Sequence, residues 1–140
     1  MKLANLYETD ETAWLEQMSK LINERRYREL DYQHLSEYLL DMAKRDRREV
    51  LHRLTTLLTH LLKWDYQPRK RSRSWQAIIL RQRHDLQDLF ESRTLENYGL
   101  EILPKAYARA TKLVAAETGL AQERFAQECP YALGDLLSER

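Results

Sequence analysis

Residues 31–62 read DYQHLSEYLLDMAKRDRREVLHRLTTLLTHLL, and this stretch decides the fold. It contains neither Gly nor Pro, the two residues that most often interrupt a helix. Asp31 is suited to cap its first turn. We therefore expect one helix over residues 32–62, roughly 46 Å long at 1.5 Å per residue. Six successive charged residues, 44–49, interrupt its apolar stripe and predict either a bend or a solvated turn. The stripe itself comprises Leu35, Tyr38, Leu39, Met42, Val50, Leu54, Leu57, Leu58, Leu61 and Leu62.

An earlier helix is predicted to start after Thr9 or Asp10, either of which can cap it. Its apolar stripe is Trp14, Met18, Leu21 and Ile22. Past the long helix, Trp64 to Ser74 is expected to be a connection, because Pro68 disfavours helical geometry at Gln67.

A third helix follows, capped by Ser72 or Ser74, and Thr94 is expected to cap a fourth. The stripe of the third helix is Trp75, Ile78, Ile79, Leu86, Leu89 and Phe90. Gly99 and Pro104 predict a kink or a break in the fourth. Its stripe is Leu95, Tyr98, Ile102, Leu103, Tyr107, Ala110, Leu113 and Val114, and Gly119 stands just past its end. Two short helical turns are predicted on either side of Cys129 and Pro130.

Composition agrees with an all-α protein. Of 140 residues, 32% are charged and 43% hydrophobic, and there are only three Gly and three Pro. Sheets and long loops need more turn-forming residues than this. We expect a single domain over residues 1–140, a helical bundle of about four main helices plus short C-terminal helical turns.

The sequence favours a cytoplasmic protein without a membrane anchor. The longest uncharged run in the apolar middle, residues 54–62, is far shorter than the roughly 20 residues that span a bilayer. The start of the chain lacks the apolar stretch of a secretion signal. One cysteine, Cys129, excludes an intrachain disulfide and suits a reducing compartment.

Positive charge is concentrated in one segment of a nearly neutral chain. The net charge is +1, yet residues 50–84 hold eight basic residues and a single acid, Asp65. Such a field predicts a polyanionic or acidic partner. Guanidinium groups match phosphate oxygens well, and helix N-termini assist them. The candidate polyanion-binding residues are Arg69, Lys70, Arg71, Arg73 and, beside them, Tyr66.

Other interpretations of this segment stay open. Its cations could be solvated, paired with acids such as Glu16, Glu37 or Asp41, or in contact with a second copy of the chain. Trp64, Tyr66 and Trp75 could stack on bases. Aromatic residues at helix ends more often close a corner of the core, and Tyr66 is then the most exposed of the three.

The sequence supplies no catalytic residues, metal ligands or cofactor motif. His52 and His60 lie eight residues apart, about 12 Å along a helix, too far to share one ion even with Glu49 nearby. His60 is expected at the core edge with a polar neighbour, and His34 and His84 at the surface. Cys129 is expected to be a buried structural thiol. Neither a glycine-rich phosphate loop nor a G-x-S-x-G motif occurs, so an enzyme is the least favoured function.

Several motifs resemble those of the DUF29 family. The central stretch is His60-Leu-Leu-Lys-Trp64, Tyr66-Gln67-Pro68 and Arg71-Ser72-Arg73-Ser74-Trp75. Flanking matches are Leu6-Tyr7, Trp14, Leu30-Asp31, Glu117-Thr118-Gly119-Leu120 and Glu128-Cys129-Pro130-Tyr131. The resemblance implies an all-helical bacterial, mainly cyanobacterial, cytosolic protein, in a family with no assigned function. It carries over no catalytic residue.

We therefore expect a small helical binding module. Its basic corner, defined here as residues 63–83, is predicted to bind a nucleic acid or another polyanion. The alternative is a protein–protein interaction module, either a homo-oligomer or one half of a bacterial regulatory pair.

Overall fold

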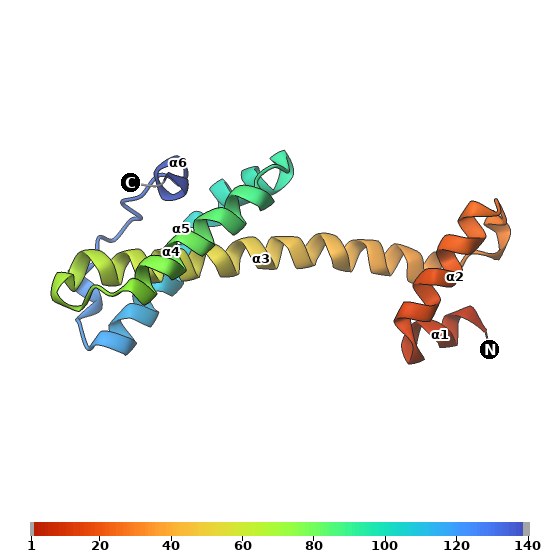
Figure 1. Cartoon of the computed structure of the whole chain (residues 1–140), viewed down its shortest axis with the longest axis horizontal. Coiled ribbons are helices and arrows are strands. Elements are labelled where there is room, and N and C mark those ends of the chain that lie inside the picture. The colour runs from red at the N-terminus through yellow and green to blue at the C-terminus, as the bar shows by residue number, and fades with distance from the viewer. Residues whose placement is uncertain (1, 139–140) are drawn as a thin grey trace. The chain divides into compact units, whose positions relative to one another are not determined.

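The computed structural model describes residues 2–138, and throughout that range the regular structure is helical, without a strand. The all-α prediction is confirmed. In chain order the elements are α1 (Leu3–Thr9), α2 (Glu11–Asn23), η1 (Tyr27–Glu29), α3 (Tyr32–Tyr66), η2 (Pro68–Lys70), α4 (Arg73–Leu89), α5 (Arg93–Thr118), η3 (Gln122–Arg124) and α6 (Leu133–Leu137). Figure 1 shows α3 as one uninterrupted ribbon.

The long helix forms as predicted and extends one turn further, to Tyr66. Asp31 caps it, since its Oδ1 accepts the backbone N–H of His34 at 3.4 Å. The charged run 44–49 is helical and mostly exposed, so α3 continues through it as one helix. None of the helices within residues 2–138 has an apolar stretch long enough to cross a membrane.

The chain divides into two compact units, Met1–Lys44 (unit 1) and Arg45–Arg140 (unit 2). In unit 1, Trp14, Met18 and Leu21 of α2 form a small buried cluster. Leu3, Leu6 and Tyr7 of α1 cover part of it. Helix α1 is absent from the sequence prediction, because at seven residues it is too short to show an apolar period.

A polar network links α1, α2 and the start of α3 in unit 1. Asp31 Oδ2 accepts the Trp14 indole N–H at 3.1 Å and lies 2.7 Å from His34 Nδ1. The His34 ring stacks on Tyr7, with centroids 4.4 Å apart. The prediction that His34 is a surface residue is therefore wrong, because Asp31 and Tyr7 hold it against the cluster.

Unit 2 holds the larger core. Val50, Leu54, Leu57 and Leu58 of α3 are fully buried together with Leu86 of α4 and Ala110 and Val114 of α5. Three residues assigned to apolar stripes are instead exposed: Ile22 (43%), Leu39 (60%) and Leu113 (45%). Ile22 and Leu39 belong to unit 1 and Leu113 to unit 2.

Helix ends in unit 2 follow the sequence with two differences. Ser72 caps α4 by accepting the Trp75 N–H, as predicted, and Gly119 ends α5 in the left-handed conformation at φ 76°. Ser92, not Thr94, caps α5, since its Oγ accepts the Leu95 N–H. Helix α5 also runs through Pro104 without a break.

Candidate functional site

The basic corner occupies the junction of α3 and α4 in unit 2. Helix α3 ends at Tyr66, Pro68 opens the short helix η2, and Ser72 restarts the chain as α4. Arg69 and Lys70 therefore lie on η2, and Arg73 is the first residue of α4. The sequence prediction that the connection begins at Trp64 is wrong by one turn, because residues 64–66 remain helical.

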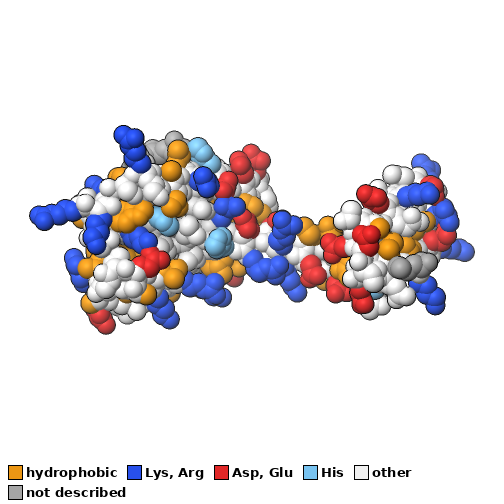
Figure 2. Space-filling view, turned by 60° about the horizontal axis from the view of Figure 1, so that its bottom comes forward, with side chains coloured by type: hydrophobic (Ala, Val, Ile, Leu, Met, Phe, Trp, Pro, Cys, Tyr) orange, Lys and Arg blue, Asp and Glu red, His pale blue; other side chains and the backbone are white. Residues whose placement is uncertain are grey.

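Three of the predicted cations are solvated. Arg69, Lys70 and Arg73 are exposed, and none forms an ion pair within 4.0 Å with any described residue of unit 2. Two other cations of the unit are neutralised: Arg53 bridges Glu49 at 2.5 Å and Asp85 at 2.7 Å, and Lys63 pairs with Glu117. In Figure 2, basic side chains project from the surface at the left of the view.

Arg71 differs from its neighbours because it folds back on α3. Its Nε donates a hydrogen bond to the Trp64 carbonyl at 2.9 Å, and its guanidinium lies 4.8 Å from the centroid of the Trp64 ring. The Trp64 carbonyl is one of the last four of α3, which have no partner within the helix. Arg71 therefore caps α3, and only its remaining donors can contact a ligand.

Tyr66 packs against the C-terminal segment of unit 2. Its ring is half-buried against Phe125, with centroids 4.8 Å apart, and its hydroxyl donates to the Arg124 carbonyl at 3.5 Å. Trp64, Tyr66 and Trp75 are all partly buried, so the prediction that Tyr66 is the most exposed of the three stays a prediction. Trp64 packs on the core as expected. Trp75 is half-buried outside the core cluster, with the Lys63 ammonium 5.8 Å from its ring.

A groove that the sequence did not reveal lies beside the basic corner. Its volume is about 600 Å³, and its walls come from the end of α3, from one face of α4 and from the segment 130–136. The face of α4 is Gln76, Ile79, Leu80 and Arg83, a helical spacing of three and four. Arg83 holds the third wall in place, because its Nε donates to the Leu136 carbonyl at 2.8 Å.

Tyr131 forms part of that third wall. Its hydroxyl donates to Asp65 Oδ2 at 2.6 Å. Burial, together with this bond, raises the pKa of Tyr131 well above its ordinary value, so the phenol stays protonated. Sequence reasoning missed the pair because its two members are 66 residues apart.

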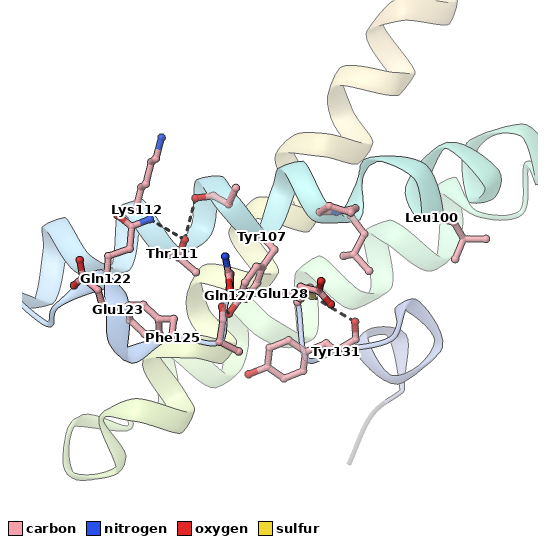
Figure 3. A pocket seen from close by; sticks show the side chains of 15 residues that line it. Leu100, Tyr107, Thr111, Lys112, Gln122, Glu123, Phe125, Gln127, Glu128 and Tyr131 are labelled. Atoms are coloured by element: carbon pink, nitrogen blue, oxygen red, sulfur yellow. Dashed lines mark hydrogen bonds between the residues drawn. The ribbon is translucent and has the colours of Figure 1, made fainter.

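A second cleft, of about 880 Å³, lies between α5 and the C-terminal segment (Figure 3). The Tyr107 hydroxyl donates to the Ala126 carbonyl at 2.6 Å and holds the two segments together. Cys129 lines this cleft, and its thiol donates to the Tyr131 carbonyl at 3.4 Å. Burial raises the pKa of the Cys129 thiol, which makes it a poorer nucleophile at neutral pH.

Of the two histidines considered as metal ligands, His60 lies where the sequence predicted, beside a polar neighbour. His60 Nδ1 lies 2.8 Å from the Thr56 carbonyl, and His52 is exposed. Within residues 2–138 no group of three or more His, Cys, Asp or Glu side chains is arranged to hold a metal ion.

Comparison with known proteins gives a family and no function. No curated protein and no solved structure matches the chain. One family model matches, over residues 6–140, and its description is "Domain of unknown function DUF29". Since the match spans nearly the whole chain, this protein belongs to the DUF29 family.

Proposed function

We propose that this protein binds nucleic acid, or a chemically similar polyanion, through the exposed cations of the basic corner. The observation that carries the proposal is that Arg69, Lys70 and Arg73 lie within five residues of one another, exposed and without an acidic partner in the described part of unit 2. Cations this close repel one another, and a string of phosphates relieves that repulsion while releasing counterions.

Local backbone and overall charge support the same ligand class. The first turn of the 17-residue helix α4 presents backbone N–H groups beside Arg73, and such groups favour anions. By sequence, unit 2 carries 17 basic and 13 acidic residues, whereas unit 1 carries six basic and nine acidic. A polyanion is therefore expected to bind to unit 2. The bacterial cytoplasm, which the family resemblance and the single cysteine favour, is the compartment we propose.

The test is binding of a fluorescently labelled oligonucleotide at low salt, followed by anisotropy. We expect the triple variant Arg69→Ala, Lys70→Ala, Arg73→Ala to bind at least about tenfold more weakly than the wild type. Its matched control removes three exposed cations from α5: Lys105→Ala, Arg109→Ala and Lys112→Ala. Equal losses in the two triples would show that only net charge matters and would contradict a localised site.

A protein partner is the second candidate, and a different surface favours it. Leu39 and Leu40 of α3 are 60% and 59% exposed within unit 1, on a unit with an excess of acids. Adjacent exposed leucines are typical of contact surfaces. If they mediate self-association, light scattering will give a mass above 16.8 kDa that falls in the variant Leu39→Ser, Leu40→Ser. A monomeric wild type would argue against self-association.

A further inference from the structure

The groove beside the basic corner has the chemical character of a site for a flat, polar-edged ring. Its apolar surface includes Leu61, Ile79 and Leu80, and the rings of Trp64 and Tyr131 lie on its lining. At about 600 Å³ it falls within the range of small-ligand sites. Flat aromatic ligands are stabilised there by stacking and by burial of their faces.

Polar groups in the groove are available for the edge of such a ring. The Gln76 amide and the Asp135 carboxylate are exposed and form no hydrogen bond with the described side chains or backbone. Together they present donors and acceptors, and amide and carboxylate groups are among the side-chain groups that pair with base edges.

The groove begins one helical turn from Arg73, a cation of the corner. Gln76 lies one helical turn after Arg73 on α4, so the same face of α4 leads from a cation into the groove. Trp64, on the opposite wall, carries the Arg71 guanidinium on its ring at 4.8 Å. A strand whose phosphate contacts Arg73 therefore has the groove residue Gln76 within one helical turn.

We propose that the polyanion is a single-stranded nucleic acid, one base of which enters this groove. The inference rests on the proposed function, because the cations of the basic corner hold the backbone. It excludes a duplex as the preferred ligand, since paired and stacked bases are not free to enter a pocket. It also predicts that inorganic polyphosphate, which has charge and no base, binds more weakly than a single strand.

The experiment compares three labelled probes at one salt concentration: a single-stranded oligonucleotide, its duplex, and inorganic polyphosphate of matched charge. The variant is Leu80→Ser, which removes apolar surface from the groove. Its control is Leu113→Ser on α5, a leucine of similar exposure (45% against 41%) that does not line the groove. A second variant, Gln76→Ala, has Gln33→Ala as its control.

We expect Leu80→Ser to weaken single-strand binding about tenfold, because the base loses apolar surface against which it is buried, and to leave polyphosphate binding unchanged. Gln76→Ala should act in the same direction, and both controls should match the wild type. Equal affinity for all three probes, with no effect of Leu80→Ser, would overturn the base-binding inference. In that case loss of binding in the Arg69, Lys70, Arg73 triple would still support the proposed function. Failure of every probe to bind would overturn both.

Discussion

At the scale of single residues, Arg71 shows how one side chain can look like a ligand contact and act as a structural one. Its guanidinium covers Trp64 and bonds the Trp64 carbonyl. We expect Arg71→Ala to lower the free energy of unfolding by about 1 kcal/mol, the combined size of an exposed hydrogen bond and a cation–π contact. Arg71→Lys, which lacks the planar guanidinium group, should recover little of the lost stability.

Chemical denaturation followed by circular dichroism measures this effect. Arg69→Ala is the control, because Arg69 is exposed and has no ion pair within the described unit 2. If the two alanine variants are equally stable, Arg71 does not cap α3, and its role in ligand binding becomes larger than we propose.

Asp31 gives unit 1 an acid-sensitive contact. Burial would raise its pKa, but the bonds from His34 and Trp14 outweigh burial and hold the pKa of Asp31 below its ordinary value of 3.8. A lowered pKa means that the carboxylate stabilises the fold above about pH 4, and that this stabilisation is lost as the pH falls through the lowered pKa.

The variant Asp31→Asn keeps the shape of the side chain and removes the charge. We expect it to be about 1 to 2 kcal/mol less stable than the wild type at pH 6, since hydrogen bonds to a charged group are lost. Unfolding curves at pH 6 and at pH 3 measure the difference. If the wild type and Asp31→Asn differ in free energy of unfolding by the same amount at pH 6 and at pH 3, the contact does not depend on the charge of Asp31.

At the scale of elements, α5 packs closely against the end of α4 at Gly99. A methyl group on Gly99 would lie 2.6 Å from Cζ of the buried Phe90 ring. We expect Gly99→Ala to destabilise the protein by about 1 to 2 kcal/mol in thermal or chemical unfolding, because overpacking outweighs the gain in helix propensity. Gly134→Ala on α6, where the added methyl meets nothing within 4 Å, should be neutral or stabilising. If Gly134→Ala instead destabilised the protein more than Gly99→Ala, the Phe90 ring would be free to move away from the added methyl group.

Helix bounds were predictable from the sequence where nearby residues determine them. The absence of Gly and Pro predicted α3, a serine before an apolar run predicted the start of α4, and Gly119 predicted the end of α5. Helix α1 was not predictable, because its stability comes from packing on Trp14 rather than from its own seven residues. Nor was the continuity of α5 through Pro104, because neighbouring contacts override the local cost of a proline.

The candidate site was predictable only in part, for the same reason. Charge density in the sequence located Arg69, Lys70 and Arg73. Which cations stay solvated depends on contacts between distant residues, such as Lys63 with Glu117 and Arg83 with the Leu136 carbonyl. The groove is likewise lined by residues from separate segments between Leu61 and Leu136, and no local sequence pattern predicts it.

At the scale of the whole molecule, a net charge of +1 conceals an uneven distribution along the chain. The two compact units carry charge of opposite sign, and each has its own apolar cluster. That residues 1–140 behave as one domain stays a prediction. We propose that the ligand binds to unit 2 alone, and we therefore expect the cations of η2 and α4 to determine the electrostatic part of binding.

The salt dependence of binding tests that claim most directly. For the wild type, the logarithm of the binding constant for a single-stranded oligonucleotide should fall linearly with the logarithm of salt concentration. Each phosphate contact contributes about 0.7 to the slope, so the triple variant Arg69→Ala, Lys70→Ala, Arg73→Ala should have a slope smaller by about 2. The Lys105, Arg109, Lys112 control should keep the wild-type slope. An unchanged slope in the first triple, or an equal reduction in the control, would contradict the account.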